Sequence, residues 1–113
     1  MSNDNISISA EQFVDEFAGL RQSLLSLYFS HDSEISRHDL LLENGFTAEQ
    51  IELTKSIASD VLKDALYTVL LGLDGAASIN KAQITYKLLD ENSNEITGDL
   101  EGIAWERFHA DNT

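Results

Sequence analysis

The chain has 113 residues, of which 20 are acidic and 7 are lysine or arginine, so its formal net charge is −13. This length suits one domain with an ordinary core, and the absence of cysteine excludes disulfides, thiolate metal sites and a cysteine nucleophile. A strongly negative field repels nucleic-acid phosphates and anionic lipid, so direct binding to nucleic acid or to a membrane is not expected.

Both ends of the chain are polar, and we predict flexible segments at residues 1–8 and 111–113. The first residues contain neither a basic stretch nor an apolar run, so no signal peptide is expected. No apolar run reaches the ~20 residues that a membrane-spanning helix requires. These features predict a cytoplasmic protein with a single domain over residues 9–110.

The first predicted helix begins at Ser9 and ends near Ser30. Ser9 and Gln12 form a capping-box pattern, in which each side chain accepts a hydrogen bond from the other residue's backbone N–H. Apolar residues then recur at steps of four and three, which predicts one buried stripe. The stripe consists of Phe13, Phe17, Leu20, Leu24 and Leu27, and Leu25 and Tyr28 widen it.

The polar segment that follows contains imidazole and carboxylate side chains, which together could bind a divalent ion. These residues are His31, Asp32, Glu34, His38 and Asp39. Their spacing matches no known site, so we expect a solvated connection and assign no metal ligand. A short helix is predicted to start here, with Ser36 and Asp39 as a weaker capping pair. Residues 40–42, all leucine, would pack inward, and Asn44–Gly45 would end the helix.

The longest predicted helix lies between Phe46 and Gly75 and forms the centre of the domain. Its first turn repeats the residue types of the first capping box, and Asp74–Gly75 closes it. Its second half, Val61 to Leu73, is apolar on nearly every side. Such a segment is typical of a core, and a homodimer face is the alternative.

A β-hairpin is predicted at about residues 83–97. Ile84, Tyr86 and Leu88 alternate with polar residues, which is typical of a half-buried strand. Turn-forming residues occupy 90–94, and residues 95–97 form a short return strand. Asp99 is then expected to cap a last helix that ends near residue 109, with a buried stripe of Leu100, Ile103, Ala104 and Phe108. The predicted fold class is therefore mainly α with a small β-hairpin (α+β), organised around one long central helix.

The sequence contains no recognisable catalytic or cofactor-binding motif. It has no nucleophile elbow and no glycine-rich phosphate loop, and its glycines are scattered singly. Asp60 and Asp64 lie one helical turn apart and could share a proton only if they were buried. Residues 90–94 lack the glycine and the glutamate of a calcium loop. We therefore predict no enzyme activity, no catalytic residue and no cofactor.

In size, charge, lack of cysteine, helical build and late hairpin, the whole chain resembles the small acidic immunity proteins that bacteria make beside secreted or contact-delivered toxins. The resemblance is one of type and carries over no individual residue. It implies a cytoplasmic inhibitor that covers a basic toxin surface. The same acidity would also serve solubility alone.

We therefore predict a small acidic binding protein that docks on and inhibits a basic partner such as a toxin or nuclease. Glu11, Asp15, Glu49 and Glu52 are the predicted contact carboxylates, because they lie in the first turns of two helices. One alternative is a DNA-mimic inhibitor from a phage or mobile element, which requires two rows of carboxylates at phosphate-like spacing. Another is an oligomeric structural or adaptor subunit.

Overall fold

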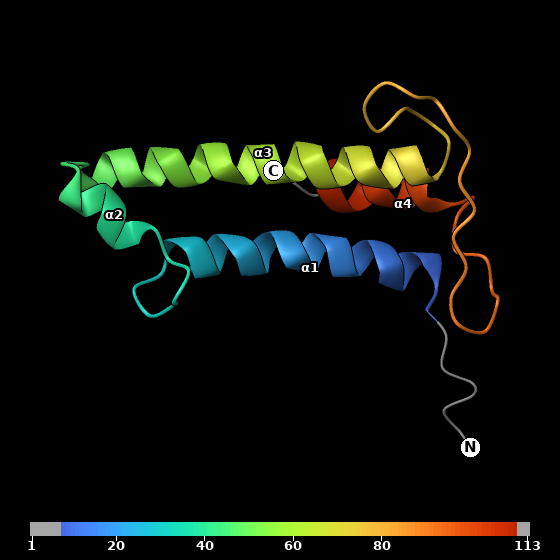
Figure 1. Ribbon diagram of the computed structural model, residues 1–113, viewed down its shortest axis with the longest axis horizontal. Helices are drawn as coiled ribbons and strands as arrows, with labels where there is room; N and C mark the ends of the chain where they lie inside the picture. Colours follow the sequence, from blue (N-terminus) through green and yellow to red (C-terminus); the bar gives the residue numbers. More distant parts are fainter. Residues whose placement is uncertain (1–7, 111–113) are drawn as a thin grey trace, which may run out of the picture. The chain divides into compact units, whose positions relative to one another are not determined.

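A computed structural model of the chain describes residues 8–110. The flexible ends predicted at residues 1–7 and 111–113 lie outside the described residues. Ile8, the last residue of the predicted N-terminal segment, packs against the core. The elements in chain order (Figure 1) are α1 (Ala10–Phe29), α2 (His38–Glu43), α3 (Ala48–Leu73), α4 (Leu100–Trp105) and the π-helical turn η2 (Glu106–Ala110).

The predicted β-hairpin is wrong, and the described residues form a mainly α structure without strands. Only one antiparallel bridge, Leu89 to Glu95, remains of the expected pairing. The tight turn itself forms, but residues 82–87 are exposed and make no β-bridge. The return segment is too short to form a strand. Its residues Ile96 and Thr97 are buried, and Gly98, with a φ of 120°, then turns the chain away from an extended path. A pair of strands this short has little stability without a sheet to join.

The predicted helix ends are largely confirmed. The Ser9 N–H donates to Gln12 Oε1 at 2.9 Å and the Gln12 N–H donates to Ser9 Oγ at 3.1 Å. Thr47 and Gln50 make the same reciprocal pair at the start of α3. The predicted pair of Ser36 and Asp39 at α2 does not form, because the Ser36 hydroxyl accepts a hydrogen bond from the His38 N–H instead, at 3.1 Å.

The chain divides into two compact units. We call the residues up to Ala18 together with those from Ala65 onward the terminal unit, and Gly19–Asp64 the middle unit. The boundary between the units falls within α1 and within α3, so each of these helices has one part in each unit. The interiors of the two units differ.

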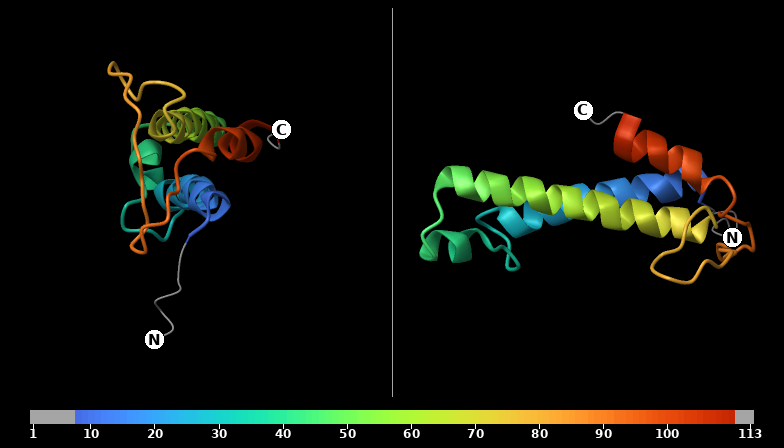
Figure 2. Two further views of the ribbon diagram at one scale, coloured as in Figure 1. Left: turned by 90° about the vertical axis from the view of Figure 1, so that its right-hand side faces the viewer. Right: turned by 90° about the horizontal axis from the view of Figure 1, so that it is seen from above.

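The terminal unit contains the main hydrophobic core. Its α4 lies beside the end of α3 and the start of α1 (Figure 2). The predicted stripe of the last helix is confirmed, since Leu100, Ala104 and Phe108 are buried and Ile103 packs against them. The buried cluster consists of Val14, Leu70, Ile96, Leu100, Ala104 and Phe108. Val69 and Leu73 of the predicted dimer surface are half-buried, and Leu70 is fully buried.

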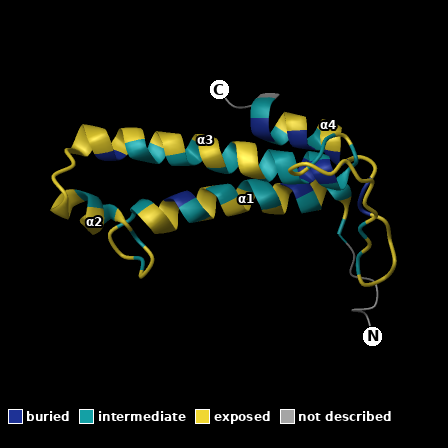
Figure 3. Cartoon of the chain, turned by 45° about the horizontal axis from the view of Figure 1, so that its top comes forward, coloured by how far each residue is buried: buried dark blue, intermediate teal, exposed yellow. Residues whose placement is uncertain are grey.

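The middle unit has far less interior. Leu25 and Ile51 are its buried residues, and α2 has none (Figure 3). The expectation that the leucines of α2 pack inward is wrong for two of the three, because Leu40 and Leu42 are 52% and 48% exposed. The predicted stripe on α1 is displaced here too, since Leu20 and Leu27 are exposed.

A polar contact takes the place of apolar packing on this part of α1. Arg21 is half-buried, and its guanidinium donates to the Ser59 carbonyl at 3.1 Å and to the Ser59 hydroxyl at 2.7 Å. Arg21 lies near the same helical face as Val14 and Leu25, which are buried. The inward face of α1 therefore includes a charged residue, which a search for apolar periodicity assigns to the outside.

Candidate functional site

The four predicted contact carboxylates are exposed, and they fall into two pairs. Glu11 and Asp15 lie on α1 in the terminal unit, whereas Glu49 and Glu52 lie on α3 in the middle unit. Asp15 is engaged within the chain, because its carboxylate accepts a hydrogen bond from Arg107 Nε at 2.7 Å. That contact raises the pKa of Arg107. Of the four, Asp15 therefore has the least free charge for a partner.

One face of α3 in the middle unit combines exposed carboxylates with exposed aliphatic side chains. A helix turns by about 100° per residue, which places six charged or aliphatic residues, together with Gln50, within an arc of about 120°. We call them the α3 face: Glu49, Leu53, Ile57, Asp60, Val61 and Asp64. Their aliphatic members are unusually open, since Leu53, Ile57 and Val61 are 61%, 55% and 60% exposed.

The negative charge of the α3 face is not balanced by the nearby lysines. Lys55 and Lys63 lie outside the arc and are half-buried. Within residues 8–110, the carboxylates of the α3 face have no Lys or Arg nitrogen within ion-pair distance. Asp60 and Asp64 are both exposed, so the burial that would make them share a proton is missing. The face therefore offers charge and apolar surface, and no acid–base pair.

Beside the α3 face, the middle unit contains an apolar groove of about 570 Å³. Its walls come from the second half of α1, from α2 and from α3, and they include Leu24, Tyr28, Leu41, Val61 and Leu62. Arg37 is its one charged lining residue, and its guanidinium lies over the Tyr28 ring at 5.2 Å. The groove is a consequence of the small interior of this unit.

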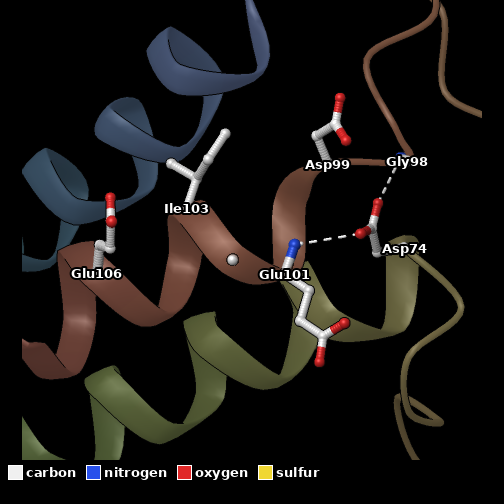
Figure 4. Close-up of a pocket in the computed structure, with 7 residues that line it drawn as sticks. Asp74, Gly98, Asp99, Glu101, Ile103 and Glu106 are labelled. Atoms are coloured by element: carbon white, nitrogen blue, oxygen red, sulfur yellow. Dashed lines mark hydrogen bonds between the residues drawn. The ribbon is translucent and has the colours of Figure 1, made fainter.

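A second, acidic pocket lies in the terminal unit beside the start of α4 (Figure 4). Asp74, Asp99, Glu101 and Glu106 contribute its carboxylates. The Asp74 carboxylate accepts hydrogen bonds from the N–H of Gly98 at 2.5 Å and of Glu101 at 3.1 Å. Both oxygens are thus used to hold the start of α4. The central acid of this pocket therefore has a structural role, which the sequence analysis missed because its partners lie 24 and 27 residues away.

The polar segment between α1 and α2 brings His31, His38 and Asp39 together. One ligand atom from each lies within 4.8 Å of the other two. The two imidazole rings meet edge to face, with centroids 4.1 Å apart. Asp32 and Glu34, the other members of the sequence cluster, are exposed and do not belong to this group. Among the described residues, these three form the one group of histidine and acidic side chains that is close enough to hold a metal ion.

Comparison with known proteins gave no relative: no protein-family model matches the chain, and no similar curated protein or solved structure was found. Among the described residues, no helix is long and apolar enough to cross a membrane.

Proposed function

We propose that the protein is a binding protein that docks on a basic protein through the α3 face and inhibits it, in the manner of small acidic immunity proteins. The observation that supports this proposal is the alternation of unpaired carboxylates with aliphatic side chains that are more than half exposed. The net charge of −13 adds long-range attraction for a cationic partner.

The two kinds of side chain would contribute differently to binding. Carboxylates that face a basic surface mainly accelerate association, and this effect weakens as salt rises. Aliphatic side chains contribute about 1.5–3 kcal/mol each when they become fully buried. An acidic helix that serves only solubility has no need of three exposed aliphatic residues, so their position among the acids favours a docking surface.

A second candidate is self-association through the apolar groove of the middle unit. An exposed apolar groove is one kind of surface that a partner can cover. A second copy of the chain would bring no opposite charge, because each copy carries −13. Charge complementarity therefore favours a basic partner over a homodimer.

The test uses three variants as baits in affinity capture from lysate of the source organism. The charge variant is Glu49→Gln/Asp60→Asn/Asp64→Asn, and the apolar variant is Leu53→Ser/Ile57→Ser. The matched control removes three exposed carboxylates from the terminal unit: Glu91→Gln/Asp99→Asn/Glu101→Gln. We expect one basic protein to be captured by the wild type and by the control, and to be lost with both α3-face variants.

The captured protein is then purified and its association rate is measured at low and moderate salt. We expect the charge variant to slow association by about tenfold or more at low salt, with a smaller difference at moderate salt. Equal binding by the charge variant and the control would overturn the proposed face. Recovery of the bait alone would support self-association, and release of the partner by duplex DNA would favour a DNA mimic.

A further inference from the structure

We propose that His31, His38 and Asp39 form a binding site for a divalent transition-metal ion, with Zn²⁺ as the expected ligand. The ligand atoms of the three side chains already lie within 4.8 Å of one another. In a tetrahedral zinc site with bonds of 2.0–2.2 Å, neighbouring ligand atoms are about 3.4 Å apart. A contraction of little more than 1 Å would therefore close the three groups around an ion.

His38 supplies the observation that points to a missing ligand. Its Nδ1, like that of His109, is buried without a hydrogen-bond partner, although buried polar atoms in proteins are nearly always paired. Of these two histidines, His38 is the one that lies among other possible metal ligands. The nearest acidic oxygen is Asp39 Oδ1, at 3.8 Å, which is too far for a hydrogen bond. An ion between the imidazole and the carboxylate would give this nitrogen the partner that it lacks.

The segment that holds the two histidines is closed at its base by hydrogen bonds. The Arg37 N–H donates to the Tyr28 carbonyl at 2.6 Å, so the residues that flank the loop are tied together. The Ser36 hydroxyl donates to the Ser30 carbonyl and accepts from the His38 N–H at 3.1 Å. These bonds fix the backbone beside both His31 and His38, so this connection can hold side chains in place around an ion.

The donor set selects the class of ion. Two imidazoles with one carboxylate suit zinc and neighbouring first-row ions, whereas calcium and magnesium prefer oxygen ligands alone. The side chain of His38 is 18% exposed, whereas that of Asp39 is 78% exposed. Because His31 is exposed as well, the two open side chains can move onto an ion held by His38. Three protein ligands leave a fourth position for water.

Isothermal titration of the full chain with Zn²⁺, in millimolar excess magnesium, tests the site. Magnesium occupies the nonspecific acidic surface, so we expect one zinc ion per chain. His38→Gln and Asp39→Asn should each weaken binding by about tenfold or more, since disturbance of outer-shell partners alone already costs that much. The matched control is His109→Gln, which changes the third histidine of the chain, in the terminal unit.

The imidazole resonances of His31 and His38 should shift in NMR spectra on zinc addition, and those of His109 should not. Because Asp39 is exposed, Asp39→Asn should leave the fold intact and keeps the test informative if His38→Gln unfolds. Zinc binding that is absent, displaced by magnesium or equally tight in Asp39→Asn and His109→Gln would overturn the site.

Discussion

At the scale of single residues, Asp90 shows how one carboxylate can organise a turn. Its Oδ1 accepts hydrogen bonds from the N–H of Asn92 and of Asn94, both at 2.9 Å. The bond from Asn94 is the main cause that holds the pKa of Asp90 below its usual 3.8, while partial desolvation opposes it. The turn is therefore tied to the ionised form of this carboxylate.

This pKa shift predicts how the turn responds to acid. A carboxyl whose pKa is lowered by folding contributes stability above its unfolded pKa of 3.8, and that contribution is lost as the pH falls through the folded value. We expect Asp90→Asn to be less stable than the wild type at neutral pH, and the difference in unfolding free energy to shrink below about pH 4. Urea denaturation at several pH values measures it, and a difference that is constant with pH would contradict the assignment.

The polar segment between α1 and α2 shows what residue-level sequence reasoning cannot reach. The sequence contains His31, His38 and Asp39, but their spacing matches no known metal site. They meet because the Arg37 N–H bonds the Tyr28 carbonyl and closes the loop. A backbone bond between residues nine positions apart leaves no mark on the side-chain pattern. The sequence therefore shows the five polar side chains of this segment, whereas the structure alone shows which three of them meet.

At the scale of elements, the start of α4 is set by a residue next to it in the sequence but stabilised by a residue far from it. The sequence places Asp99 at the N-cap, and Asp99 does occupy that position, yet its side chain makes no capping bond. Asp74, at the end of α3, supplies the capping carboxylate instead. The helix boundary could be predicted, but the residue that stabilises it could not, because its partners are distant in the sequence.

This exchange of roles gives a direct comparison of two aspartates. Asp74→Ala should lower the free energy of unfolding by about 1–2 kcal/mol, since it removes a carboxylate that accepts hydrogen bonds from two backbone N–H groups. Asp99→Ala should change it by less than about 0.5 kcal/mol, as surface substitutions usually do. Thermal or urea unfolding of both variants checks this. If both variants lost the same unfolding free energy, or if Asp99→Ala lost more, Asp74 would not be the main capping residue of α4.

The helices and the hairpin differ in how far their signals extend along the chain. Helix-end signals act within a few residues. The two capping boxes, Ser9–Gln12 and Thr47–Gln50, form as expected, and α3 ends shortly before Gly75, as expected. The hairpin depended on pairing across a turn and on a sheet to join. Residues 84–88 have the right alternation, but their return segment packs Ile96 into the helical core instead. Tertiary packing thus overrides a local strand pattern.

At the scale of the whole molecule, burial is concentrated in one of the two units. Eight hydrophobic residues are buried in the described part, and all except Leu25 and Ile51 belong to the terminal unit. The proposed partner face, the apolar groove and the proposed metal site all lie in the middle unit. A binding function placed in the less buried unit is consistent with the general use of regions of low local stability for ligand binding.

α3 allows this difference to be measured within a single helix. Its 26 residues form one uninterrupted helix, but residues 57–61 include two side chains that are more than half exposed, whereas Leu70 is fully buried. Local opening is easier where few buried contacts must break. We expect amide hydrogens of residues 57–61 to exchange through openings about 2 kcal/mol or more easier than those of residues 69–72. Native-state exchange read by NMR measures both segments together. Equal protection along α3 would show that the helix opens as one unit. The exposed side chains of the α3 face would then not reduce the local stability of that part of the helix.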